Sequence, residues 1–211
     1  QERRILCKIP FGESEFLAAE YVLQDYSIGY TQLCRLNASG AIIARYNVAV
    51  NDKISALLLN GDELYVGGCF SAYGDTMDFY YRSAYLAKFD AALLQQDPTF
   101  PACSYPVKHL AYDARLGTFL FGQFGAFHTN GGQEVLWIKP DASQQELFIG
   151  GLGQIYNTLL FPDELVICGS FFGPNGSVDS TLSVNLQTLQ QRGYTRCWKS
   201  THDLTVMAWQ N

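Results

Sequence analysis

Histidine is the side chain best suited to acid–base or metal chemistry near neutral pH, and this chain has three. His109 lies in an apolar run, which predicts a packed residue rather than a ligand. His128 stands in the loop 127–132, a place where binding residues often lie. His202 is next to Asp203, but adjacency in sequence does not create a proton relay. No second His or Cys stands at ligand spacing, so we expect no metal site and no cofactor.

The sequence also lacks the signature of a nucleophilic enzyme. The segment 169–173 places Ser170 between glycines at the wrong spacing for a nucleophile elbow, so we assign Ser170 a structural role. The acidic pairs 62–63 and 163–164 occupy matching positions after an apolar run, which favours turn formation over a general acid–base pair. A hydrolase with carboxylates converging on one mouth stays a third hypothesis, because sequence does not show which carboxylates share a cleft.

Six cysteines allow three disulfides or none, and no CxxC pair indicates a zinc site. We expect Cys69 and Cys168 to be buried, inert thiols because each lies in an apolar, glycine-containing run. A disulfide between Cys7 and Cys197 would join the two ends of the fold, although the sequence does not fix the connectivity.

Two aromatic loops carry the candidate binding residues. Three consecutive aromatics in the loop 75–82 cannot all point to one face of a strand, so at least one should be exposed or should pack on a neighbour. Aromatic rings beside Asp and Arg suit a sugar or a protein partner. The loop 25–30 occupies the corresponding place earlier in the chain. The alternative is that these rings pack on an adjacent blade or another subunit. The candidate ligand- or partner-binding residues are Tyr26, Tyr30, Asp78, Phe79, Tyr80, Tyr81, Arg82 and His128.

Composition predicts a folded chain. Of its 211 residues 48% are hydrophobic, 14% aromatic and 16% charged, which fits one domain over 1–211. The net charge of −6 and the scattered basic residues argue against nucleic acid as a partner. No apolar run reaches the roughly 20 residues of a membrane span, so we expect no membrane insertion. Six cysteines and the sequons at Asn37 and Asn175 favour a location outside the cytosol.

An apolar segment that ends in an aromatic residue recurs roughly every fifty residues. The copies are 15–21, which is the weakest, 64–70, 118–124 and 165–171. A second strand-like run follows each copy, at 33–37, 86–90, 137–141 and 183–187. Apolar runs at 54–59 and 155–161 precede two copies and end in turn residues. One repeat therefore reads as four short strands, which is typical of a propeller blade.

Gly68, Gly122 and Gly169 recur at one position of this motif. Glycine weakens the interior of a strand, so its recurrence predicts crowding where sheets approach one another near a central axis. The alternative interpretation is that these glycines mark β-bulges.

The repeats are expected at roughly 1–50, 51–104, 105–153 and 154–200. The segment 204–209 resembles a first strand, whereas no clear first strand precedes the copy at 15–21. If 201–211 completes the first blade, an all-β propeller of about four four-stranded blades closes into a ring without unpaired edges. The alternative is that the chain is one arc of a larger ring.

The second repeat carries a family likeness. The segments 66–70, 85–90 and 97–100 resemble the delta-60 type β-propeller repeat, with its Gly-Gly-x-Phe core and its Asp-x-x-Phe ending. The likeness covers 54–100 well and 107–148 in outline, while the first and last copies are degenerate. It implies a propeller of the kind found in large bacterial surface proteins, fungal cortical proteins and phage tail or fibre components. It assigns no catalytic residue.

These observations favour a non-enzymatic structural or adhesive module of a virion tail or fibre, or of a cell-surface assembly. Such a module would contact other protein subunits or a receptor, at an extracellular or virion surface. The alternative hypothesis is a lectin-like propeller that binds glycans through its aromatic loops.

Overall fold

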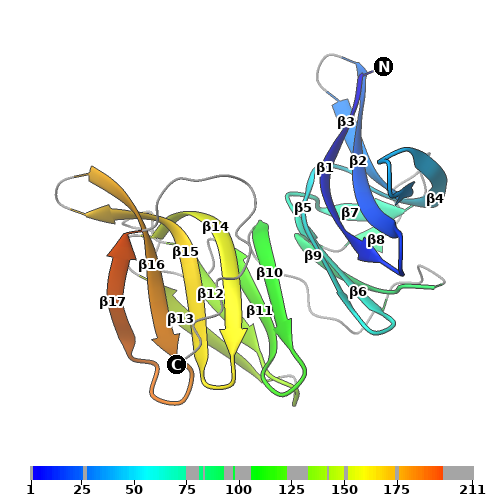
Figure 1. Ribbon diagram of the computed structural model, residues 1–211. Coiled ribbons are helices and arrows are strands. Elements are labelled where there is room, and N and C mark those ends of the chain that lie inside the picture. The colour runs from blue at the N-terminus through cyan, green and yellow to red at the C-terminus, as the bar shows by residue number, and fades with distance from the viewer. Residues whose placement is uncertain are drawn as a thin grey trace.

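A computed structural model describes residues 2–25, 28–74, 81–82, 84–92, 97, 106–122, 133–141, 143–149, 152–173 and 176–196. Every element in these segments is a β-strand, and antiparallel pairing joins the strands into four sheets, named A to D in chain order (Figure 1). The prediction of an all-β chain is confirmed. The described segments contain no helix that could cross a membrane.

Sheet A has six strands in the order β1-β2-β3-β4-β7-β8. Their bounds are β1 (Glu2–Phe11), β2 (Glu15–Asp25), β3 (Ile28–Asn37), β4 (Ile42–Val50), β7 (Ala72–Gly74) and β8 (Tyr81–Arg82). β1 pairs with β2 along its length, so the prediction that no clear first strand precedes the copy at 15–21 is wrong. The first repeat therefore has a first strand of its own. The segment 201–211, which was expected to supply one, lies outside the described residues.

The other sheets keep their strands in chain order. Sheet B contains β5 (Ile54–Asn60), β6 (Glu63–Gly68) and β9 (Leu86–Asp90). Sheet C contains β10 (Val107–Asp113), β11 (Gly117–Gly122), β12 (Gln133–Ile138) and β13 (Gln144–Ile149). Sheet D contains β14 (Leu152–Phe161), β15 (Glu164–Gly173), β16 (Gly176–Asn185) and β17 (Gln191–Arg196). Four-stranded units were expected throughout; sheets C and D match this, whereas sheet A has six strands and sheet B has three described ones.

The recurring motif falls on the second strand of every sheet, namely β2, β6, β11 and β15. The strand-like runs that follow it fall on the third strands β3, β9 and β16, while the run at 137–141 covers only the last two residues of β12 and the turn after it. An Asx turn comes after each third strand, where a side-chain oxygen accepts a hydrogen bond from the backbone N–H two residues later. The residues that form it are Asn37, Asp90, Asp141 and Asn185. The sequon at Asn37 therefore lies in a turn with exposed neighbours, while Asn175 lies outside the described residues.

A β-bulge interrupts the first strand of every sheet at the same height. The extra residues are Leu6 in β1, Ser55 in β5, Lys108 in β10 and Tyr156 in β14. Gly68, Gly122 and Gly169 each pair with the residue just before the bulge. The bulge interpretation of these glycines is therefore confirmed, with the bulge on the partner strand.

Gly68 is crowded as well. A Cβ atom there would lie 2.1 Å from the backbone oxygen of Lys53. At Gly67 a Cβ atom would lie 2.6 Å from Cγ1 of Val107, which belongs to sheet C. At Gly68 the crowding therefore comes from the backbone of Lys53 and Ile54 in its own sheet, whereas the next sheet crowds Gly67, which is not one of the recurring glycines.

Successive sheets pack face to face through apolar clusters. The cluster between sheets A and B includes Leu17, Ala19, Leu33, Leu64, Val66, Phe70 and Phe89. The cluster between sheets B and C includes Tyr65, Leu86, Val107, Leu110 and Ile138. The cluster between sheets C and D includes Phe119, Phe121, Val135, Trp137, Leu165, Ile167 and Leu182. Sheets B and C thus bury both faces, because alternate side chains of a strand point to opposite sides.

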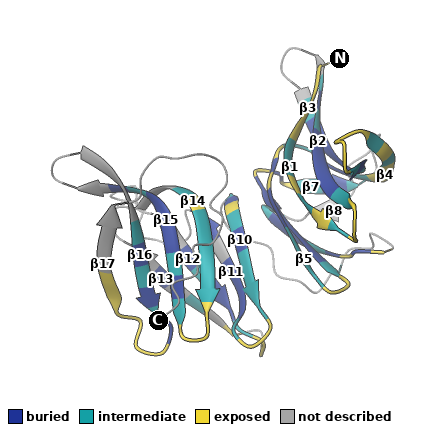
Figure 2. Cartoon of the chain, viewed as in Figure 1, coloured by how far each residue is buried: buried dark blue, intermediate teal, exposed yellow. Residues whose placement is uncertain are grey.

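The four sheets form an open series. The first strands are neighbours in space, β1 beside β5, β5 beside β10, and β10 beside β14. Sheets A and D lie at opposite ends in Figure 1, and no described strand of sheet A packs on sheet D. Buried residues run along middle strands such as β2 and β15, while the hairpin turns are exposed (Figure 2). The ring closure considered from sequence is not seen among the described residues.

Gly68→Ala should lower the free energy of unfolding by about 2–3 kcal/mol, the cost of forcing a methyl group into a packed site. Gly61→Asn is the matched control, because Gly61 has nothing within 4 Å and a φ of 55° that Asn tolerates. Urea denaturation of both variants measures the difference. Equal stabilities for the two would contradict the crowding described at Gly68.

Candidate functional site

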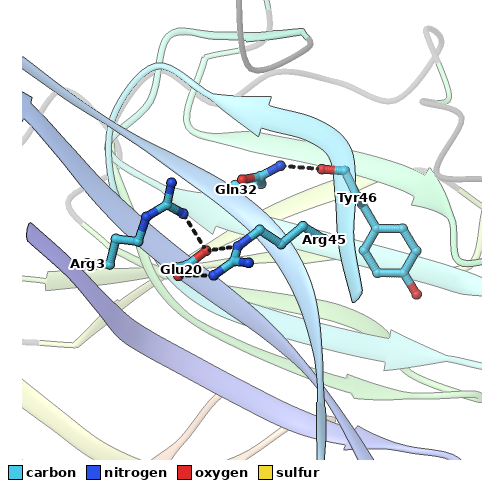
Figure 3. Close-up of polar contacts among 5 residues, drawn as sticks. All are labelled: Arg3, Glu20, Gln32, Arg45 and Tyr46. Carbon is cyan, nitrogen blue, oxygen red and sulfur yellow. Dashed lines mark hydrogen bonds and ion pairs between the residues drawn. The ribbon is translucent and has the colours of Figure 1, made fainter. Parts of the chain in front are cut away.

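The most unusual side chain of the fold is a carboxylate buried on the face of sheet A that points away from sheet B. The Glu20 side chain is 3% exposed. Arg45 donates two hydrogen bonds to this carboxylate, from Nε to Oε2 at 2.8 Å and from Nη2 to Oε1 at 3.0 Å. Arg3 donates from Nη1 to Oε2 at 3.1 Å (Figure 3). The carboxylate is thereby shared by two guanidinium groups.

Three strands of sheet A supply this network. Arg3 comes from β1, Glu20 from β2 and Arg45 from β4, so the guanidinium of Arg45 reaches across β3. Gln32 of β3 lies opposite Glu20 in the register and donates from Nε2 to the backbone oxygen of Tyr46 at 2.7 Å (Figure 3). The polar groups therefore tie four neighbouring strands together on one face.

An apolar floor lies under these charges. Ala18, Val22, Cys34 and Leu36 point to the same face and are each at most 2% exposed. Lys8, opposite Ala18 in the register, places its ammonium 4.4 Å from the centre of the Phe16 ring. We call this surface the outer face of sheet A; it consists of Arg3, Lys8, Phe16, Ala18, Glu20, Val22, Cys34, Leu36 and Arg45.

Hydrogen bonds keep Glu20 ionised despite its burial. The bond from Arg45 lowers the pKa of Glu20 most, burial acts in the opposite direction, and the charges of Arg45 and Arg3 lower it further. Burial, together with the charge of Glu20, raises the pKa of the nearby Cys34 thiol to about 11. A carboxylate held by two guanidinium groups stays ionised near neutral pH, so Glu20 is poorly suited to donate a proton as a general acid.

The alignment of the four repeats with one another did not reveal Glu20, because it placed the first repeat one residue out of register with the others. The motif comparison set Ala19 against Gly68, but Ile5 pairs with Glu20 before the bulge just as Ile54 pairs with Gly68. Glu20 therefore stands where three other repeats have glycine. The available signal was a lone acidic residue inside an otherwise apolar segment.

The residues predicted to bind a ligand are placed differently from the expectation. Tyr30 is 8% exposed and packs with Val22 and Ala49, so it offers little surface to a ligand, contrary to the prediction. Tyr81 and Arg82 form β8, which pairs with β7 at the edge of sheet A. The second aromatic loop thus extends the neighbouring sheet, in line with the alternative interpretation. The residues outside the described segments are Tyr26, Asp78, Phe79, Tyr80 and His128.

The cysteine predictions hold in part. Cys7 is a free thiol that packs on the cluster between sheets A and B, where burial raises its pKa to about 12. The structure thus gives no support to its predicted disulfide with Cys197, which lies outside the described residues. Cys168 is buried as expected, but Cys69 is exposed because it follows the last residue of β6, where the chain leaves the sheet.

The other chemical candidates are structural in the described part of the chain. Nε2 of His109 lies 3.0 Å from Oγ1 of Thr158, and burial lowers the pKa of this histidine, in agreement with a packed role. Ser183 of β16, which lies opposite Val166, donates a hydrogen bond from its hydroxyl to the carboxylate of Glu164. Within the described segments no three His, Cys, Asp or Glu side chains are grouped closely enough to hold a metal ion.

Comparison with known proteins assigns no family. No family model and no curated protein matches the chain. Among solved structures, hydrazine synthase of Kuenenia stuttgartiensis is 9% identical with a TM-score of 0.45 over 76% of this chain and 60% of that one. An apocarotenoid oxygenase of Synechocystis gives 9% and 0.45 over 86% of this chain and 46% of that one. The chain thus spans about half the length of these proteins, and likeness of this degree says nothing about activity.

Arg45→Met should lower the free energy of unfolding by about 1–2 kcal/mol. The loss leaves Glu20 buried with Arg3 as its remaining ion-pair partner, and partial exposure of Arg45 keeps it moderate. Arg115→Met is the control, because Arg115 makes an exposed 3.5 Å ion pair with Asp113. Chemical denaturation that ranks the two variants equally would contradict a structural role for the Glu20 network.

Acid should weaken the fold through Glu20. Its pKa in the folded chain is lower than the ordinary value of 4.5, so its stabilising contribution is complete above about pH 4.5 and declines as the pH falls toward the lower value. Glu20→Gln should therefore flatten the loss of stability below pH 4.5, measured by urea denaturation at stepped pH. Glu13→Gln, at an exposed turn, should keep the wild-type slope; equal slopes for both variants would refute this assignment.

Proposed function

We propose that this chain is a non-enzymatic, propeller-type structural module that joins a larger virion or cell-surface assembly through the two end faces of its sheet series. Two features support the propeller-type arrangement: the sheets follow one another in chain order, and their first strands are neighbours in space. In this scheme sheets B and C are interior blades, while sheets A and D present surfaces to protein partners outside the chain.

The contrast between the two faces of sheet D carries the proposal. On the side toward sheet C, Leu165 and Ile167 are 0% exposed. On the other side, Phe161 is 47% exposed, and its neighbours in the sheet are half-buried. We call this side the outer face of sheet D; its described residues are Asn157, Leu159, Phe161, Glu164, Val166, Cys168, Thr181, Ser183 and Arg192.

Apolar side chains on an open sheet face are a typical mark of a protein interface. Among the described residues, the cluster between sheets C and D includes Leu160, Leu165 and Ile167 but not Leu159, Phe161 or Val166. The outer face of sheet A has an apolar floor as well, under the charges of Arg3 and Arg45. This floor is covered, so the part of the face that a partner could contact consists of the partly exposed guanidinium groups of Arg3 and Arg45, and arginine is enriched at protein interfaces. These observations support assembly more than sugar binding, because the described part of the aromatic loop is engaged in sheet A.

The mass of the native complex tests this function. We expect affinity-tagged chain purified from its source under native conditions to have a mass well above that of one chain. Cross-linking should connect Lys8, on the outer face of sheet A, to a neighbouring protein more often than Lys139, at a hairpin of sheet C. A lone monomer that binds glycans on an array would refute assembly and favour the lectin alternative.

A further inference from the structure

In the first three sheets, the residue that follows the bulge of the first strand faces the next sheet. Cys7 of β1 packs on the cluster between sheets A and B, and Ala56 of β5 belongs to the cluster between sheets B and C. The equivalent residue of β10 is His109, whose Nε2 lies 3.0 Å from Oγ1 of Thr158 on β14 of sheet D. We call the contact between sheets C and D the C–D seam; it consists of the apolar cluster between these sheets together with His109 and Thr158. An imidazole ring thus stands at a position that sheets A and B fill with small side chains.

The surroundings of His109 suit a neutral ring. Phe121, its partner in the register of β11, is 0% exposed, and the two ring centres lie 5.6 Å apart. The hydroxyl of Thr158 can donate to or accept from Nε2 of a neutral imidazole. Within the described part of the C–D seam, His109 therefore meets an aromatic ring and a hydroxyl, and neither carries a negative charge that would balance an added proton.

No carboxylate faces His109 from the strands that pack most closely against β10, which are β5, β6, β11 and β14. The sequences of β5, β11 and β14 contain no Asp, Glu, Lys or Arg. Tyr156 is the ionisable residue of β14, and it is 43% exposed at the bulge. Glu63 and Tyr65 of β6 belong to sheet B, which lies on the other side of sheet C from sheet D.

β10 itself offers no counter-charge at close range. Lys108, the bulge residue before His109, is another cation. Tyr112 stacks on Tyr65 toward sheet B. Asp113 is four residues along β10, about 13 Å away by the usual rise of a strand, and is ion-paired at the hairpin. A proton on His109 would therefore be an uncompensated charge in the described part of the seam, and such a charge is costly away from water.

Side chains alone hold the C–D seam in the described segments. β10 lies beside β14, but no described strand of sheet C pairs with one of sheet D. The first two repeats differ, because β7 of the second repeat pairs with β4 of sheet A. A junction without shared strands can open locally while each sheet keeps its own hydrogen bonds, so a charge inside it should act there first.

We propose that His109 makes the C–D seam acid-sensitive: its neutral ring packs against Phe121 and Thr158, and uptake of a proton from solvent loosens sheet D from sheet C. This property goes beyond the proposed assembly role and does not depend on it. Burial lowers the pKa of His109 below its ordinary value of 6.5. The opened seam binds the proton more readily, so the seam keeps its full stability above about pH 6.5 and loses it as the pH falls toward the lower value.

A thiol placed in the C–D seam tests this opening. Val184→Cys suits the purpose, because Val184 is 2% exposed in the cluster between sheets C and D, and Cys7 is a natural free thiol at the contact between sheets A and B. A pyridyl disulfide reagent modifies both thiols, mass spectrometry separates them, and each rate is divided by that of the same thiol in denatured chain. From about pH 7.5 to about pH 5.5, protection at position 184 should fall about five- to tenfold, since each pH unit below 6.5 allows at most a tenfold rise in opening. Protection of Cys7 should change less than about twofold.

His109→Gln in the same background should abolish the fall, because an amide can still bond Thr158 but does not titrate. The same substitution at His128 is the matched control and should keep the fall. The inference is overturned by constant protection at position 184, by an equal loss at Cys7, or by a fall that persists without His109. Circular dichroism checks that each variant folds. NMR titration of the wild-type ring gives a test without any substitution at this residue: a His109 that titrates at or above 6.5 would also overturn the inference.

Discussion

The two-residue period of the β-strand is the constraint on which this structure depends. A sheet placed between two others is covered on both faces, so the central residues of its middle strand are apolar on both sides. Sheet B shows this with Val66 buried on the side of sheet A and Tyr65 on the side of sheet C. The glycine opposite the bulge in sheet B meets a local demand as well, because the backbone of Lys53 leaves no room for a Cβ atom at Gly68.

Sheets A and D stand at the ends of the series, where one face has no described sheet of this chain packed against it. In sheet A the glycine position holds Glu20, and two arginines give its buried charge a partner. A buried carboxylate is costly without such pairing, so the loss of either arginine should leave Glu20 less well stabilised. Among the described residues of the outer face of sheet D, Phe161 at the hairpin is half in solvent. One end of the series is therefore charged and closely covered, and the other exposes an aromatic ring at its edge.

Much of the fold was readable from the sequence, because the motif and its following strand repeat with apolar residues at fixed places. The second strands fall on these segments in all four sheets, and the third strands do so in sheets A, B and D. Pairing between repeats was not readable, so the attachment of β7 and β8 to sheet A was foreseen only as an alternative. The Glu20 site was missed for a related reason: its partners come from β1 and β4, and only the bulged register reveals the equivalence with Gly68. The sequence did not show that Tyr30 is buried, because an aromatic residue near a loop can point to either face of its strand.

The attachment of β7 to β4 has a consequence for how the molecule comes apart. Backbone hydrogen bonds from the second repeat continue sheet A, with Val50 opposite Tyr73, and Tyr73 also packs edge-on against Phe89 of sheet B. The first two repeats are therefore joined by backbone hydrogen bonds as well as by side-chain packing. Sheets C and D meet through side chains in the described segments. Regions joined by a shared sheet tend to open as cooperative units, so we expect the first two repeats to open together, separately from sheets C and D.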